Sequence, residues 1–140
     1  MSTAIQEHAW SMLVPHHASG ASQARQRLAD RLHGHIPPTL VADAVAVAAE
    51  LLGNAVRHAA PLPGGVIRLA CRMGTALSDA YVELRVSDGG SSMVPIERSA
   101  NPDSVDGRGL AIVAALARSW GVDREDDGQC VWAELRCATA

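Results

Sequence analysis

Polar side chains recur at helical spacing in the segment 50–58. Glu50, Asn54 and His58 lie four residues apart, so a helix would project all three from one side. A carboxylate can accept a proton and an amide oxygen can bind a hard cation, so this stripe suits metal and proton chemistry. An ordinary amphipathic helix with a solvated polar face has the same spacing. The stripe therefore indicates a site only together with further motifs.

A second motif, Asp88-Gly89-Gly90, follows an apolar alternation that ends at Val86. Continuing that alternation places Asp88 on the apolar face at the end of a strand. A buried carboxylate is costly unless it has a partner, and the exocyclic amine of a base would serve. The two glycines would let such a ligand approach the backbone closely. The alternative is a plain turn, because Asp-Gly is a common turn pair.

A third motif, Gly107-Arg108-Gly109-Leu110, opens a predicted helix after a loop at about 91–106. This loop is longer than most connections in compact domains, and such loops are often lids. Glycines at a helix N-terminus expose backbone N–H groups where the helix dipole favours an anion. The alternative is a flexible loop-to-helix junction. The motif is neither a Rossmann fingerprint nor a Walker A loop, because no strand leads into it and no Gly-Lys-Ser/Thr occurs.

The remaining sequence predicts the elements that position these motifs. We expect strands at about 9–14, 66–72, 81–87, 122–125 and 130–137, and helices at about 20–35, 40–60 and 108–120. Ser19 or Ser22 would cap the first helix, and Thr39 the second. Gly74 would form the turn between the second and third strands, and Gly121 would stop the last helix.

This order of elements predicts one α+β domain over residues 1–140. We expect a two-layer sandwich in which helices cover one face of a mostly antiparallel sheet. In the second helix, the side chains opposite the polar stripe would pack into the core. These are Val41, Val45, Leu52, Val56 and Ala59.

Composition narrows the class of protein. The 140 residues are 48% hydrophobic and carry a net charge of −3, with few aromatic side chains. A nucleic-acid-binding protein would usually have a basic excess, so we expect no direct nucleic-acid contact. The three cysteines form no CxxC pair, which favours reduced thiols in a cytoplasmic protein. We also expect no signal peptide, no membrane span, and no transition-metal site at the histidines.

Taken together and in this order, the three motifs and the lid-sized loop resemble those of the GHKL ATPases, the Bergerat-fold superfamily. Within it, the chain is similar to small single-domain anti-sigma-factor serine/threonine kinases. The resemblance extends over the whole chain, including the closing segment 131–135. It implies an ATP-binding protein with Mg²⁺ as cofactor.

The resemblance assigns roles residue by residue. Glu50 matches the general base, and Asn54 the amide that ligates Mg²⁺ between the phosphates. Asp88 matches the aspartate that accepts a hydrogen bond from the adenine amine, with Gly90 beside the base.

The resemblance also assigns the phosphate side of the site. Gly107 and Gly109 match the glycines around the triphosphate, with Leu110 completing the motif. Arg108 would contact a phosphate or remain solvated. His58 matches a variable polar position near the nucleotide.

Two departures from the family pattern concern recognition of the adenine base. The family often has Thr after Gly in the closing strand, whereas this chain has Cys130, preceded by Gln129. A thiol is a poor substitute for a hydroxyl as a hydrogen-bonding group, which bears on adenine affinity. The motif Asp88-Gly89-Gly90 is also short of glycine, because two serines follow it.

The resemblance implies a protein serine/threonine kinase that phosphorylates a STAS-type anti-sigma-factor antagonist and holds a sigma factor inactive. The identity of the partner and the oligomeric state, including a homodimer, stay open. The alternative is a non-catalytic ATP-binding or protein-interaction module of the same fold. A histidine kinase fits poorly, because the chain has no room for a phosphoacceptor helical hairpin. A gyrase-type or chaperone-type ATPase would need further domains.

Overall fold

Five strands form a single antiparallel sheet. The computed structural model describes residues 6–76, 78–90 and 105–138. Its elements are β1 (Gln6–Pro15), α1 (Ala18–Leu32), α2 (Pro38–His58), β2 (Val66–Ala76), β3 (Asp79–Asp88), α4 (Val105–Leu116), β4 (Ser119–Glu125) and β5 (Gly128–Ala138). The strands lie in the order β1-β2-β3-β5-β4, and every neighbouring pair is antiparallel.

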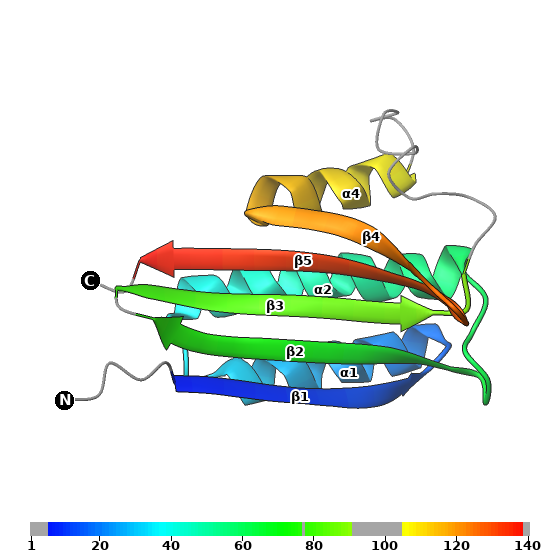
Figure 1. The fold of residues 1–140 in the computed structure, drawn as a ribbon, viewed down its shortest axis with the longest axis horizontal. Helices are drawn as coiled ribbons and strands as arrows, with labels where there is room; N and C mark the ends of the chain where they lie inside the picture. The colour runs from blue at the N-terminus through cyan, green and yellow to red at the C-terminus, as the bar shows by residue number, and fades with distance from the viewer. Residues whose placement is uncertain (1–5, 77, 91–104, 139–140) are drawn as a thin grey trace.

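The helices lie on one side of this sheet. Figure 1 shows α1 and α2 behind the strands, with α4 beyond the edge formed by β4. Helix α2 packs between α1 and α4 and against the central strands β3 and β5. The predicted α+β architecture, with helices on one face of an antiparallel sheet, is therefore confirmed.

Strict alternation in the strands separates the core from the uncovered face. In β3, Ala80, Val82, Leu84 and Val86 are fully buried, while the residues between them are only partly buried. The inward side chains of β2 and β5 continue this layer, and the leucines of α1 and α2 cover it. A period of two with one buried face is typical of a sheet that has helices on one side only.

The buried face of α2 differs from the one expected. Val41, Val45, Val56 and Ala59 are only partly buried, whereas Leu52 is buried as predicted. The side chains that α2 buries are Leu40, Ala44, Val47, Ala48, Leu51, Leu52 and Ala55. At about 100° per residue, this set is rotated by roughly a quarter turn from the predicted face. The reason is that α2 packs against the sheet and two helices at once, so its buried arc is wide and includes small alanines.

The helix starts also differ from the sequence prediction. Helix α1 begins at Ala18, and the ring Nδ1 of His17 caps it by accepting a hydrogen bond from the Ser19 backbone N–H at 3.1 Å. Neither predicted serine is the cap. Helix α2 begins at Pro38 without a side-chain cap. A proline there sacrifices no intrahelical hydrogen bond, because the first N–H groups of a helix have no partner in it. Thr39 thus lies inside the first turn.

Two glycines predicted as turn or stop residues lie within strands. Gly74 pairs with Tyr81 in the β2–β3 ladder, so this hairpin turns after Ala76. Helix α4 ends at Leu116, and the Arg118 N–H already donates to the Glu134 carbonyl of β5 at 2.7 Å. Trp120 and Gly121 consequently belong to β4. In both places, pairing with a neighbouring strand prevails over a local signal read from glycine or helical spacing.

Helix α2 alone among the described residues is long and apolar enough to cross a membrane, by length and composition only. The expectation that no apolar stretch approaches this length was therefore wrong. The core helix of a soluble protein passes the same test, and α2 packs its apolar face against the sheet and its neighbouring helices. Length and apolar composition arise here because α2 is the central helix.

Candidate functional site

The C-terminal ends of α2 and β3 and the turn between β4 and β5 come together at one end of the molecule. Figure 1 shows these ends on the same side as the N-terminal end of α4. The Ala60 N–H donates to the Gly90 carbonyl at 3.0 Å, and the Gly89 N–H donates to the Ala60 carbonyl at 2.7 Å. Residues after α2 and residues after β3 are thus bonded to each other. The chain therefore brings the first two motifs of the sequence to one place.

His16, which sequence reasoning did not select, also holds the end of α2. Its Nε2 lies 3.0 Å from the Ala55 carbonyl oxygen and 2.8 Å from that of Ala59. The last carbonyls of a helix have no intrahelical partner, so a donor there satisfies them. The His16 backbone N–H is bonded in turn to the Gly65 carbonyl. His16 thus joins the end of β1 to the end of α2 beside the candidate site.

Asp88 lies on the inner face at the end of β3, as predicted. Its side chain is 2% exposed, and the Gly90 N–H donates to its Oδ1 at 2.7 Å. Burial raises the pKa of Asp88, and hydrogen bonds from Gly90 and from the Gln129 side chain oppose that rise. A buried carboxylate with a raised pKa at the end of a strand is an unusual cost, and such groups gather at functional sites.

The glycines around Asp88 have structural reasons of their own. A side chain at Gly89 would collide with the Pro61 carbonyl oxygen, and one at Gly128 would collide with the Asp88 carbonyl oxygen. Gly90 has a φ of 93°, which L-residues rarely adopt. Gly89 and Gly128 therefore allow two backbone segments to pack closely, and the role of Gly90 beside a ligand stays a prediction.

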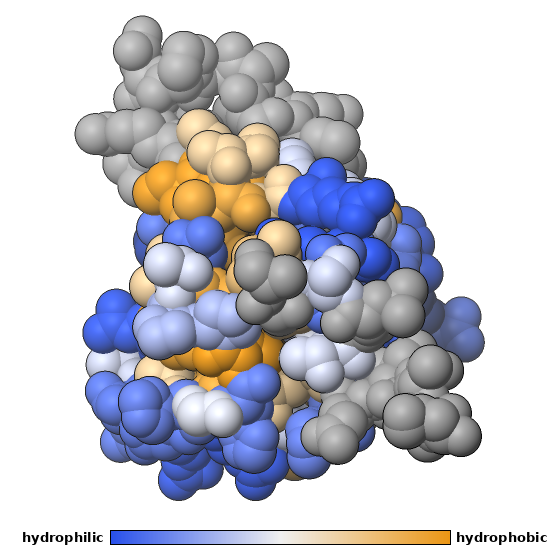
Figure 2. All heavy atoms as spheres, turned by 90° about the vertical axis from the view of Figure 1, so that its left-hand side faces the viewer, coloured by the Kyte–Doolittle hydropathy of each residue, from blue (hydrophilic) through white to orange (hydrophobic). Residues whose placement is uncertain are grey.

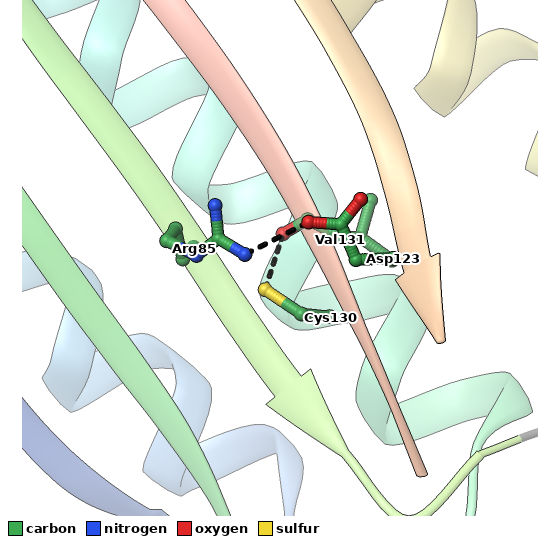
Figure 3. Close-up of polar contacts among 4 residues, drawn as sticks. All are labelled: Arg85, Asp123, Cys130 and Val131. Carbon is green, nitrogen blue, oxygen red and sulfur yellow. Dashed lines mark hydrogen bonds and ion pairs between the residues drawn. The ribbon is translucent and has the colours of Figure 1, made fainter. Parts of the chain in front are cut away.

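The register of β5 corrects the assignment of Cys130. Antiparallel pairing sets Gln129 opposite Asp88, and Cys130 opposite Ser87. Cys130 therefore faces the side of the sheet that is opposite the described helices. Figure 3 shows its sulfur beside Arg85, whose guanidinium bonds to Asp123 at 3.0 Å. The expectation that Cys130 stands at the adenine-supporting position of the closing strand was wrong by one residue, and one residue in a strand means the opposite face of the sheet.

Gln129, which was not among the predicted site residues, lies beside Asp88 instead. It is 2% exposed, and its side chain donates a hydrogen bond to Asp88. Its Oε1 is buried without a hydrogen-bond partner among the described residues. The alternation Val131, Ala133, Leu135 contains the signal that could have found it, because counting back by two reaches Gln129.

The polar stripe of α2 borders the buried face. Glu50 and Asn54 are partly buried, and His58 is exposed at the last helical residue. Arg57 Nη2 donates to Asn54 Oδ1 at 3.0 Å. A cationic donor thus already occupies the amide oxygen proposed to bind a cation. The charge at the Asn54 end of the stripe is therefore positive.

The third motif lies inside α4, which begins at Val105, before the predicted start. Val105 and Asp106 are therefore helical, whereas the rest of the predicted lid, 91–104, lies outside the described residues. In α1 and α2 the first i→i−4 bond is donated by the fourth helical residue, which in α4 is Arg108. The amide of Gly107 therefore remains available to an anion, whereas those of Arg108 and Gly109 do not. Leu110 is 1% exposed. Leu110 therefore packs in the interior of the protein and presents almost no surface to a ligand.

Among the described residues, no three His, Cys, Asp or Glu side chains gather as a metal site. A magnesium ion held through phosphates and one amide oxygen would need no such cluster. The residues present fit a nucleotide: a buried carboxylate and an unpartnered amide oxygen suit the base, and the amide of Asn54 suits the metal.

Comparison with known proteins gives one family. The family model of the histidine kinase-like ATPase domain matches residues 14–135, most of the chain. No curated protein matches it. The match runs from the end of β1 to β5, so it includes all three motifs and the residues around Asp88.

Proposed function

Because the chain belongs to the family of histidine kinase-like ATPase domains, we propose that it is an ATP-binding regulator that phosphorylates serine or threonine on a partner protein. The observation that carries nucleotide binding is Asp88. Its carboxylate is buried at the end of β3, bonded to Gly90 and Gln129, and its pKa is raised by burial. The amine of adenine would give this carboxylate a hydrogen-bond donor.

Asn54 is the residue suited to hold the metal. When bound, Mg²⁺ would neutralise charge between the phosphates. Arg57 keeps the Asn54 amide oriented by donating to its Oδ1, and must release it for a cation to bind there. At the start of α4, the free amide of Gly107 would face the phosphates.

Glu50 lies one turn before Asn54 on the same side of α2 and is suited to act as the general base. In the proposed step, the serine or threonine Oγ of the partner forms a bond to the γ-phosphorus of ATP. The bond from that phosphorus to the β–γ bridging oxygen breaks, ADP leaves, and the hydroxyl proton passes to Glu50. Catalysis of this kind depends mostly on positioning and electrostatics.

The finer parts of the proposal rest on resemblance to anti-sigma-factor kinases. The phosphorylated partner would be a STAS-type antagonist, the regulated partner a sigma factor, and the site of action the cytoplasm. No direct contact with nucleic acid or membrane is needed for this role. A homodimer is compatible with it.

The second candidate is a non-catalytic ATP-binding or protein-interaction module. The short glycine motif, in which serines follow Gly90, favours it. The thiol of Cys130 does not favour it, because it lies on the opposite face of the sheet from Asp88.

Phosphoryl transfer from labelled ATP to a purified STAS partner distinguishes the two. Glu50→Gln keeps the size of the side chain but removes the base, so transfer should fall by about 100-fold or more while nucleotide binding persists. Asp43→Asn is the matched control, since Asp43 lies two turns earlier on the same side of α2. A wild type that binds the partner yet transfers no phosphate would favour the module. Full transfer by Glu50→Gln would keep the kinase and exclude Glu50 as its base.

A further inference from the structure

The unsatisfied oxygen of Gln129 has no function in the fold described so far. Gln129 is 2% exposed, and its Oε1 is buried without a partner in the part of the chain that the structure describes. A buried acceptor without a donor destabilises a folded protein, and native structures contain few of them. An orphan acceptor beside a buried carboxylate therefore calls for a ligand that donates.

The amide of Gln129 and the carboxylate of Asp88 lie side by side. The two residues are direct partners in the β3–β5 ladder, and the Gln129 amide nitrogen donates to the Asp88 carboxylate. Because Oε1 shares the amide group with that nitrogen, this bond holds Oε1 next to the carboxylate as well. The Gly90 N–H engages Oδ1 of Asp88. Two buried acceptors are thus adjacent at the end of the sheet.

We propose that Gln129 is a specificity-determining residue whose Oε1 accepts one hydrogen of the adenine amine while Asp88 accepts the other. This inference rests on the proposed nucleotide binding. An exocyclic –NH₂ presents two hydrogens in the plane of the ring, which matches two adjacent acceptors. A purine with an oxo group at that position presents an acceptor to both, and like acceptors repel. The pair would therefore select an amino-purine more strongly than Asp88 alone.

A simpler role for Gln129 is to satisfy one acceptor of Asp88 in the unliganded fold through the hydrogen bond that it donates. The two roles predict opposite changes when Gln129 is replaced by Met. If Oε1 contacts the amine, the 6-amino group increases the nucleotide affinity of the variant less than it increases that of the wild type. If Gln129 acts only on Asp88, the freed carboxylate accepts a hydrogen bond from the amine at least as well as before. The amine then increases the nucleotide affinity of the variant by as much as in the wild type, or by more.

The experiment compares Mg-ADP with the Mg complex of purine riboside diphosphate, which has hydrogen in place of the 6-amino group. Dissociation constants are measured by calorimetry for the wild type and for Gln129→Met. We expect the amine to tighten binding more in the wild type than in the variant, by about 2- to 12-fold, the range of one neutral hydrogen bond. An equal or larger gain in the variant would overturn the inference.

The controls keep this comparison independent of folding. Each protein is compared with itself, so a partly folded fraction cancels from the ratio of its two constants. Gln129→Leu repeats the test with a different side chain, and Gln23→Met, exposed on α1, should behave as the wild type. Failure of the wild type to bind ADP would overturn the proposed function and this inference together. Binding of ADP without the expected coupling would overturn the inference alone.

Discussion

Replacing Asp88 by Asn tests nucleotide recognition with little change of shape. The Gly90 N–H can still donate to the remaining oxygen, as it does to Oδ1 at 2.7 Å. The new amide can donate to Gln129 Oε1, which has no partner among the described residues. We therefore expect Asp88→Asn to fold. What it loses is the charged acceptor for the base.

The expected loss of affinity follows from the kind of hydrogen bond removed. A hydrogen bond to a charged group contributes about 1.5 to 3 kcal/mol. At about 1.4 kcal/mol per factor of ten, the dissociation constant for Mg-ADP should rise roughly 10- to 150-fold. An amide that turns its NH₂ toward the adenine amine would place two donors against each other, so the upper part of this range is expected.

Stability without nucleotide should change in the other direction. Burial raises the pKa of Asp88, so its ionised form is less favourable in the folded chain than in the unfolded chain. The contribution of Asp88 to the free energy of unfolding is present below the unfolded pKa and is lost as pH rises through the folded pKa. At neutral pH, unliganded Asp88→Asn should therefore be at least as stable as the wild type. This advantage should shrink as the pH is lowered toward the ordinary pKa of Asp.

Calorimetric titration with Mg-ADP and thermal unfolding of the unliganded proteins measure the two effects. Equal affinity in wild type and variant would refute the placement of the base on Asp88. A variant that binds weakly and is also less stable at neutral pH would show that the carboxylate serves the fold. Only weak binding with retained stability agrees with a residue kept for its ligand.

Further predictions concern α2 and the far face of the sheet. Asn54→Ala should abolish the gain in nucleotide affinity on adding Mg²⁺ while leaving thermal unfolding nearly unchanged; unfolding of the variant would instead assign Asn54 to the helix. Cys130→Ser should change the dissociation constant for Mg-ADP by less than about twofold, because the sulfur lies on the uncovered face; a large loss would contradict the register of β5. Gly53→Ala should raise the free energy of unfolding by about 0.5 to 1 kcal/mol in urea titrations, because glycine is unfavourable inside a helix. The added methyl would meet only the flexible end of Arg57, at 2.8 Å; destabilisation would show that Arg57 cannot move.

The order and type of the elements could be predicted from sequence because strong patterns determine them. Alternation in 81–87 gave the buried face of β3, and with it the position of Asp88 on the inner face. The break at Pro37 and Pro38, the second of which begins α2, separated the helices. Such patterns follow from the backbone itself, since a strand repeats every two residues and a helix every 3.6.

What failed depended on contacts between distant segments. Trp120 continues the helical spacing of α4, but it pairs with Ala133 of β5 and therefore belongs to β4. The buried face of α2 was misplaced because the helix contacts the sheet and two neighbours, which no window of its own sequence reveals.

The choice between Cys130 and Gln129 is a different kind of error. It depended on which residues of β5 face the core. Counting back from Leu135 in steps of two reaches Gln129 and would have placed that residue on the inner face. His16 had no local signal at all, because its partners are the carbonyls at the end of α2.

The end of the molecule that carries Asp88 is built from segments far apart in the chain. His16 holds the end of α2, residue 60 bonds to residues 89 and 90, and Gln129 returns from the last strand to Asp88. No single hairpin or helix contains this arrangement, so it exists only when the whole sheet is formed. A ligand that binds there is linked to global unfolding, and at a hundred times its dissociation constant it would add about 2.7 kcal/mol to stability. Bound nucleotide would therefore protect β1 from proteolysis as well as β3, although β1 is an edge strand and β2 lies between the two.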